Sequence, residues 1–369
     1  MIKPQEVLLM GGYGRAGTEI ARLLVEYSEY FITITGRNKQ KAEITAITLN
    51  NRASAERCKG IALDITDSKA LEKVLPEYDL LINCVPLPTN DKQVIRIICE
   101  AGVHYVDLIP GKSKRAQFEK YKSVIIQNNS ICVLEAGWEP GLPAFLAQLG
   151  VQKLNDKAKN IEVHAVYREK EMPYTSIADI MEHADLTASF LEEGQWVRKS
   201  IIHNQNMQFP EPFGNVTGYP AELAELKSTA VDLGLRSLTF YHGGYNPICD
   251  LILFIWTALG LRNNEYLKSA GVNLFRWANN WFTKPPFGGI IKVKLKGNSK
   301  SLQITASTED LYRATAIPVV AAVKQILDKT INDVGVHFMG SAAKPEEFEE
   351  EITRMGISID IQQNNHVIT

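Results

Sequence analysis

A glycine-rich turn near the start of the chain has the residue types and spacing that bind a pyrophosphate. Gly12 allows a tight turn, Gly14 lets the backbone approach phosphate oxygens, and Gly17 allows a helix to pack closely on a strand. An apolar run precedes the turn and an amphipathic stretch follows it, so the N–H groups at the helix start would face the anion. A tight turn with only a structural role is the alternative. We therefore predict that the whole turn binds a dinucleotide: Gly12, Tyr13, Gly14, Arg15, Ala16 and Gly17.

The residues after the next β-rich run, Phe31–Thr35, indicate which nucleotide binds. Sites that prefer NAD usually place an acidic residue about 20 positions after the glycine turn, where it binds the ribose 2′-hydroxyl. Here the run is followed by Gly36, Arg37 and Asn38. A guanidinium pairs with a 2′-phosphate, so the sequence favours NADP. NAD is the alternative, with Arg37 solvated or stacked on the adenine.

Two further strand ends belong to the same predicted crevice. Asp64 and Ile65 follow the third strand, where the adenine edge would lie. Asp64 could instead cap the helix that begins near Ser68, although Asp67 or Ser68 could also do so. The fourth strand ends in a loop that would pass under the pyrophosphate and the nicotinamide ribose: Asn83, Cys84, Val85 and Pro86.

Three side chains are candidates for moving a proton. Tyr105 and Asp107 are two positions apart on a predicted strand, so they share one face and could form a coupled pair. The alternative is that Asp107 only fixes the following loop. His242 lies in the run Tyr-His-Gly-Gly-Tyr and would act as acid or base near neutral pH, unless it is structural. Arg168 and Arg236 would grip a substrate carboxylate or, alternatively, are surface charges.

The elements that must position these residues follow an alternating pattern. Between Glu6 and Leu134, short β-rich runs alternate with amphipathic stretches, as in successive βα units. The runs are almost wholly apolar, which is typical of a parallel sheet covered on both faces. The predicted strands are Val7–Met10, Phe31–Thr35, Ile61–Leu63, Leu80–Cys84, Tyr105–Leu108 and Ile131–Leu134.

After Gly137 the pattern changes. Ile161–Arg168 alternates like a half-buried strand, and Ile290–Lys296 with Leu302–Ser307 resembles an antiparallel pair. We therefore predict an α/β protein: a Rossmann-type doubly wound parallel sheet with an inserted second α+β domain that carries an antiparallel sheet. The predicted bounds are 1–137 for the dinucleotide-binding domain, 138–310 for the second domain, and 311–369 for a segment that returns to the first.

Composition and charge exclude several classes of partner. The net charge is −2, which gives no electrostatic reason to expect nucleic acid. The five cysteines are scattered without metal-ligand spacing, so we expect neither a metal site nor disulfides. The chain starts without a signal-like segment, which predicts a cytoplasmic protein. The most apolar stretch, Ile248–Leu261, is too short to span a bilayer, and is expected to be a buried helix or an interfacial or dimer-contact segment.

The ordered motifs resemble those of the saccharopine dehydrogenase-like family: GGYGRAG, TGRN, LDITD, INCVPLP, AGVHYVDL and EAGWEPGLP. One departure is the sequence VPLP after the fourth strand, where many relatives have a glycine. The resemblance implies an NAD(P)-binding domain, an inserted second domain and a homodimer. It also implies that Tyr105 and Asp107 lie near the nicotinamide end. The positions that match the family's cofactor contacts are Gly12, Gly14, Gly17, Arg37, Asp64, Asn83 and Val85.

The function that this resemblance implies is an NADP-dependent oxidoreductase acting on a small molecule. The expected reaction is hydride transfer to or from a C=N or C–N bond of an amino-acid-like or polyamine-like substrate. Members of the family reduce imines, oxidise amines or reduce alkenes, so membership does not select the substrate. The alternatives are an enoyl or ketone reductase with a lipid-like substrate, and a non-enzymatic NADP-binding sensor or scaffold.

Overall fold

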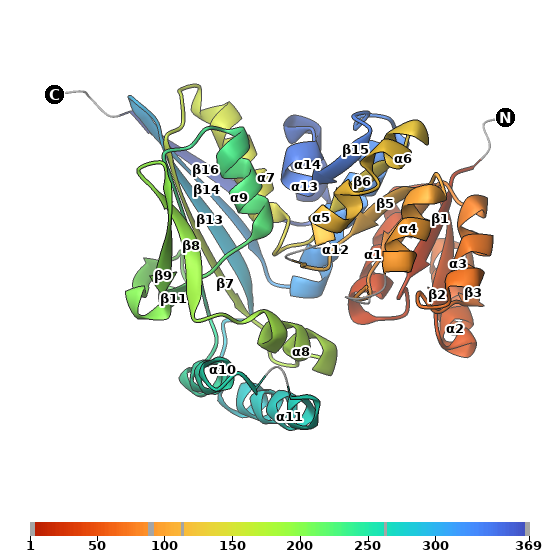
Figure 1. The fold of residues 1–369 in the computed structure, drawn as a ribbon, viewed down its shortest axis with the longest axis horizontal. Coiled ribbons are helices and arrows are strands. Elements are labelled where there is room, and N and C mark those ends of the chain that lie inside the picture. The colour runs from red at the N-terminus through yellow and green to blue at the C-terminus, as the bar shows by residue number, and fades with distance from the viewer. Residues whose placement is uncertain (1–3, 88–91, 112–113, 262–263, 366–369) are drawn as a thin grey trace. The chain divides into compact units, whose positions relative to one another are not determined.

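The computed structural model describes residues 4–87, 92–111, 114–261 and 264–365, which form two compact units (Figure 1). Residues 1–149 and 312–357 make up the first unit, and residues 150–311 and 358–369 make up the second. The second unit is thus inserted into the first along the chain.

The first unit is built on a parallel sheet of seven strands in the order β15-β6-β5-β4-β1-β2-β3. Because β1 pairs with β2 on one side and β4 on the other, the strand order reverses at β1. In a doubly wound sheet this reversal opens a crevice at the carboxyl ends of the two neighbouring strands. The strands are β1 (Glu6–Met10), β2 (Phe31–Gly36), β3 (Cys58–Ala62), β4 (Leu80–Asn83), β5 (His104–Asp107), β6 (Ile131–Leu134) and β15 (Gly335–Phe338).

Helices cover this sheet because its strands are apolar on both faces. Val7, Leu8 and Leu9 of β1 have no exposed surface, and Leu80, Leu81 and Ile82 of β4 have none either. Burying an aliphatic side chain contributes about 1.5–3 kcal/mol, so these central strands stabilise the unit strongly. The helices of the unit are α1 (Arg15–Tyr27), α2 (Lys39–Ala53), α3 (Ser68–Val74), α4 (Lys92–Glu100), α5 (Lys114–Glu119), α6 (Lys122–Gln127), α7 (Leu142–Leu154), α12 (Leu311–Leu327), α13 (Met339–Ala342) and α14 (Pro345–Met355).

The second unit contains the predicted second sheet, which has nine strands and is antiparallel except at one pairing. The strand β7 pairs antiparallel with β13 but parallel with β12. The predicted hairpin is confirmed, since β13 and β14 pair from Gly289–Thr308 to Lys296–Ser301. The strands are β7 (Asn160–Arg168), β8 (Thr187–Glu192), β9 (Gln195–Ser200), β10 (Gln205–Gln208), β11 (Asn215–Pro220), β12 (Ser237–Gly243), β13 (Gly288–Lys296), β14 (Lys300–Thr308) and β16 (Ser358–Asn365).

The division into units differs from the expected bounds at both ends of the insertion. Most of α7 lies in the first unit, because Phe145 is fully buried with its ring 4.6 Å from that of Phe348 on α14. The last strand, β16, pairs along its whole length with β14 and so lies in the second unit. The segment after residue 311 therefore supplies helices and β15 to the first unit and β16 to the second.

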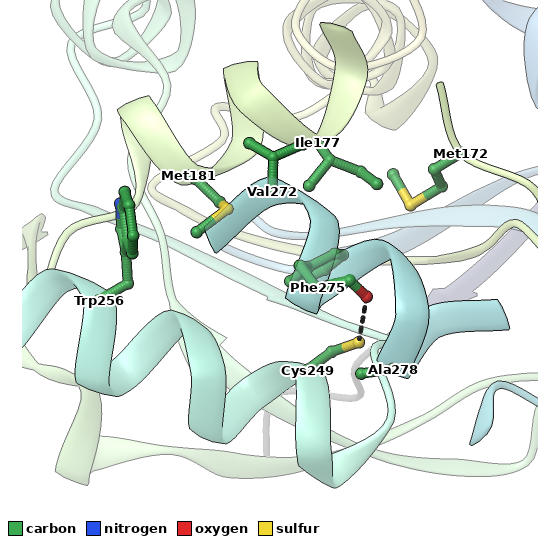
Figure 2. Close-up of a cluster of buried hydrophobic side chains, with 8 residues drawn as sticks. All are labelled: Met172, Ile177, Met181, Cys249, Trp256, Val272, Phe275 and Ala278. Atoms are coloured by element: carbon green, nitrogen blue, oxygen red, sulfur yellow. Dashed lines mark hydrogen bonds between the residues drawn. The ribbon is translucent and has the colours of Figure 1, made fainter. Parts of the chain in front are cut away.

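Three helices of the second unit enclose a small core of their own: α8 (Tyr174–His183), α10 (Pro247–Ala258) and α11 (Glu265–Phe282). The core side chains come from all three helices and from the residues before α8 (Figure 2). In α10, which contains most of the stretch Ile248–Leu261, Cys249 and Trp256 are buried whereas Leu251 and Leu259 are exposed. The apolar stretch is thus a half-buried helix. No helix in the described part of the chain is long and apolar enough to cross a membrane.

Candidate functional site

The glycine turn lies at the carboxyl end of β1, at the crevice where the strand order reverses. Both Gly11 and Gly12 donate their N–H groups to the Thr35 carbonyl at 3.0 Å, which ties the turn to the end of β2. Gly14 is the N-cap of α1 and, having no side chain, makes no capping hydrogen bond to this helix. The amide groups that open α1 therefore point into the crevice with the positive end of the helix dipole, as an anion site requires.

Gly17 is required because other backbone lies too close for a side chain, whereas Gly12 and Gly14 are less tightly packed. A Cβ atom at Gly17 would lie 2.3 Å from the Gly11 carbonyl oxygen, and one at Gly12 would lie 3.1 Å from the Leu9 carbonyl oxygen. At Gly14, the nearest atom to a Cβ is the Gly11 oxygen at 3.2 Å. Gly17 thus lets α1 pack on the turn, and Gly14 stands directly before the first amide groups of α1. This cradle fits a pyrophosphate.

Tyr13 connects the glycine turn to the residues after β2. Its hydroxyl accepts a hydrogen bond of 3.1 Å from the Asn38 N–H. Its ring packs on Gly36, where a Cβ atom would lie only 2.4 Å from Tyr13 Cε1. Asn38 also caps α2, since its Oδ1 accepts from the Lys41 N–H at 3.0 Å. The sequence prediction did not identify Gly36 as necessary, because only the packing of the Tyr13 ring requires it.

The next two predicted residues lie at the edge of the same crevice. Arg37 is exposed directly after β2, and its charge contributes to a lowered pKa of the Asp64 carboxyl. The first cause of that lower pKa is the hydrogen bond from the Thr66 N–H, at 3.0 Å from Asp64 Oδ1. Asp67, not Asp64, caps α3 by accepting from the Ala70 N–H. Asp64 therefore orders its own loop, and the adjacent Ile65 is buried.

The loop after β4 packs directly against the glycine turn. The Val85 Cγ1 atom lies 2.7 Å from the position of a Cβ at Gly11, so the two segments touch. Cys84 donates its N–H to the Met10 carbonyl, and burial raises the pKa of its thiol well above the ordinary value. Asn83 shapes the loop, because its Oδ1 accepts from the Val85 N–H and its Nδ2 donates to the Val85 carbonyl. Pro86 is exposed beside them.

Tyr105 and Asp107 form a buried hydrogen-bonded pair in β5. The Tyr105 hydroxyl donates to Asp107 Oδ2 at 2.9 Å, and neither residue has exposed surface. Burial, and next the charge of Asp107, raise the pKa of Tyr105 well above its usual value. Asp107 Oδ1 also accepts from the Glu135 N–H at 2.9 Å. Asp107 thus both pairs with Tyr105 and holds the backbone that follows β6.

A lysine that the sequence prediction missed completes this group. Lys114 Nζ donates to Asp107 Oδ1 at 2.7 Å and to the Ile109 carbonyl, with only 9% of its side chain exposed. The Asn83 Nδ2 lies 3.2 Å from the Tyr105 hydroxyl, which links the group to the loop that touches the glycine turn. The sequence carries no signal for Lys114, since exposed lysines are common and burial depends on how α5 docks.

His242 belongs to the second unit. Its ring lies 4.8 Å from that of Tyr167 and 5.7 Å from that of Tyr245, between centroids. Beside them Arg168 donates from Nε to the Gly244 carbonyl and lies over the Phe213 ring. The other predicted cation, Arg236, is 63% exposed and pairs with Glu193, as its surface-charge interpretation predicts.

The reversal of strand order, the glycine cradle and the contact between Gly11 and Val85 define the first unit as a dinucleotide-binding domain of the Rossmann type. Residues 7–133 match the family model described as the saccharopine dehydrogenase NADP binding domain. The predicted resemblance and the predicted NADP-binding domain are thus confirmed for this region.

Two similar proteins extend the comparison. Over 160 residues the chain is 28% identical to the saccharopine dehydrogenase [NADP(+), L-glutamate-forming] of Schizosaccharomyces pombe; the match covers 43% of this chain and 33% of that protein. The chain therefore spans about a third of the length of this curated relative. The apo saccharopine dehydrogenase (L-Glu forming) of Saccharomyces cerevisiae has a similar fold, with a TM-score of 0.71 at 13% identity over 98% of this chain and 100% of that one.

Proposed function

We propose that this protein is an NADP-dependent oxidoreductase of the saccharopine dehydrogenase-like type. Its reaction would transfer a hydride to or from a C=N or C–N bond of an amino-acid-like or polyamine-like substrate. The observation that carries the proposal is the match of residues 7–133 to the NADP-binding domain family, together with a glycine cradle that fits a pyrophosphate. A homodimer, which the resemblance implies, is part of the proposal.

Each predicted cofactor residue has a place in this proposal. The N–H groups of Arg15, Ala16 and Gly17 would bind the pyrophosphate, and the Arg37 guanidinium would bind the 2′-phosphate. Asp64 and Ile65 would border the adenine, while the loop from Asn83 to Pro86 would lie along the nicotinamide ribose. NADP itself supplies the hydride acceptor or donor when bound.

The buried group at β5 would control a proton near the reacting carbon. Tyr105 and Asp107 are too deeply buried to touch a substrate, so we assign them the role of positioning residues for Lys114. The Lys114 ammonium has three protons, of which two are used by Asp107 and the Ile109 carbonyl. The third proton would be available to a substrate amine or imine. We keep His242, in the second unit, as a candidate acid or base.

The test is a cofactor titration followed by a substrate screen with the full chain. We expect NADPH to bind more tightly than NADH, and NADPH to be oxidised when a keto acid and an amino acid are offered together. Oxidation only with enoyl thioesters or ketones would replace the C–N assignment by a reductase of lipid-like substrates. Tight binding without turnover of any of these would favour the sensor or scaffold instead.

A matched pair of variants separates a catalytic role of Lys114 from a structural one. Lys114→Arg keeps the cation and the bond to Asp107, whereas Lys114→Met removes both. We expect the arginine variant to keep the fold and NADPH binding but to lose kcat. An arginine variant with the full kcat would overturn the proton role of Lys114, because a guanidinium does not release protons near neutral pH.

A further inference from the structure

The two helices α10 and α11, whose buried sides share one core, each expose several large apolar side chains to solvent. The most exposed are Trp281 at 73% and Leu259 at 68% of their surface. Single exposed apolar residues are ordinary, but a contiguous group marks an interaction site. We call this group the outer face, and it consists of Leu251, Phe254, Ile255 and Leu259 of α10 with Leu267, Leu274, Trp277, Trp281 and Phe282 of α11.

The outer face follows helical spacing on both helices. In α11, Leu267, Leu274, Trp277 and Trp281 are separated by seven, three and four positions, which places them on one side. The opposite side of α11 is already packed, since Val272, Phe275 and Ala278 are buried in the core shared with α8 and α10 (Figure 2). Each helix thus has an apolar side for the core and a second apolar side that the unit itself does not cover.

The described side chains of these two helices include few exposed charges. Among the exposed side chains that the structure describes on these two helices and in the two residues after α11, the charged ones are Arg276 and Lys284. Lys268, which is partly exposed on α11, is held 3.1 Å from Glu182 of α8. The Asp250 carboxyl of α10 is half-buried near His242, so it does not belong to the outer face.

We propose that the outer face docks onto the surface of an anionic phospholipid bilayer, with α10 and α11 lying in the interface. Tryptophan and phenylalanine are preferred at this depth, and helices that lie on membranes combine such an apolar face with lysine and arginine. Complementary charge favours this partner over a second copy, because a twofold contact would bring the same cations together. The helices cannot cross the bilayer at their length.

Vesicle flotation of the full chain tests this proposal. We expect the protein to float with vesicles of phosphatidylcholine and phosphatidylglycerol at equal parts, and much less with phosphatidylcholine alone. Raising the salt concentration would reduce the bound fraction, because the cations contribute to the attraction. Protein that stays at the bottom of the gradient with both kinds of vesicle would overturn the proposal.

Matched variants locate the contact. Leu274→Ser combined with Trp281→Ser should weaken partitioning at least about tenfold, since both side chains would enter the interface. The control is Trp196→Ser combined with Ile202→Ser, at side chains that are 43% and 78% exposed on β9 and on the short helix after it. This control variant should float like the parent. Equal loss in both pairs would overturn the proposal, and unchanged thermal unfolding confirms that each variant is folded.

A measurement of mass in solution distinguishes a second copy as the partner. The proposal predicts that sedimentation gives the same oligomeric state for the parent and for the Leu274, Trp281 variant. A parent dimer that this variant converts to monomers, without vesicle binding by either, would assign the outer face to a contact between copies. Arg276→Glu should lower vesicle binding and leave the oligomeric state unchanged.

Discussion

The Lys114 ammonium lies 2.7 Å from the Asp107 carboxylate, and the two side chains have 9% and 0% of their surface exposed. The ion pair therefore lies almost completely out of water, where each charge depends on the other. The Tyr105 hydroxyl and the Glu135 N–H complete the hydrogen bonding of Asp107. Such pairs contribute less to stability than to fixing the geometry of the groups around them.

Removing the lysine from this pair should destabilise the protein strongly. Lys114→Met leaves Asp107 buried without its counter-ion, which costs about 3–5 kcal/mol. The control is Lys294→Met, which breaks an ion pair with Glu162 whose side chains are 44% and 39% exposed and should cost under about 1 kcal/mol. Urea unfolding measures both. Similar losses of stability in the two variants would show that water can take the place of the Lys114 ammonium beside Asp107.

The two alanine variants of the glycine turn should separate folding from binding. Gly17→Ala places a methyl group 2.3 Å from a carbonyl oxygen and should cost about 1–3 kcal/mol of stability. Gly14→Ala has its nearest contact at 3.2 Å, so its melting temperature should change little. Both variants should bind NADPH weakly, as a fluorescence titration would show. Parent-like binding by Gly14→Ala would mean that the phosphates do not approach there.

Arg37→Ala should change the choice of nucleotide. Losing a charge-assisted hydrogen bond to the 2′-phosphate costs about 1.5–3 kcal/mol, or roughly 10- to 100-fold in NADPH affinity. NADH, which lacks this phosphate, should bind nearly as before. Lys39→Ala is the control, because this lysine is 68% exposed nearby on α2. An unchanged NADPH preference in Arg37→Ala would show that the guanidinium does not contact the phosphate.

The Asp250 carboxyl should make stability depend on pH. Burial raises its pKa from 3.8 to about 7, while His242 lowers it in part. The folded chain binds this proton more tightly than the unfolded chain does. The resulting contribution to the free energy of unfolding is complete below pH 4 and is lost as the pH rises to about 7. Asp250→Asn should remove about 2 kcal/mol of this pH dependence, after allowing for partial contact with solvent. Asp232→Asn, at an exposed carboxyl, should keep the parent profile in urea unfolding at each pH.

Asn246 should matter more than an ordinary helix cap. Its Oδ1 accepts from the Ile248 and Cys249 N–H groups at 3.0 Å, and its Nδ2 donates to Thr283 Oγ1 at 2.9 Å, beyond the end of α11. Asn246→Ala should cost about 2–4 kcal/mol by thermal unfolding. Asn38→Ala removes an exposed cap with one bond and should cost about 1 kcal/mol. A loss of stability in Asn246→Ala no larger than in Asn38→Ala would contradict the role of Asn246 in joining α10 to α11.

The parallel sheet could be predicted because its strands are short, apolar and separated by amphipathic helices. Some predicted strand bounds were wrong, because polar residues and glycines can pair as part of a strand. The third strand was predicted at Ile61–Leu63, but pairing with β2 begins it at Cys58, across Lys59 and Gly60. The hairpin of β13 and β14 was also readable, because its two strands follow each other closely in the chain. The parallel pairing of β12 with β7 was not, since it joins distant segments.

The sequence alone identified the glycine turn, the arginine after β2 and the strand-end motifs as parts of a dinucleotide site. These features are local: a turn, a helix start and a strand end each depend on a few neighbouring residues. Tertiary structure alone decided that Lys114 is buried on Asp107, and that one apolar side of α10 is packed while the other is exposed. Both depend on contacts between segments far apart in the chain, and an apolar helix does not encode which of its sides will be covered.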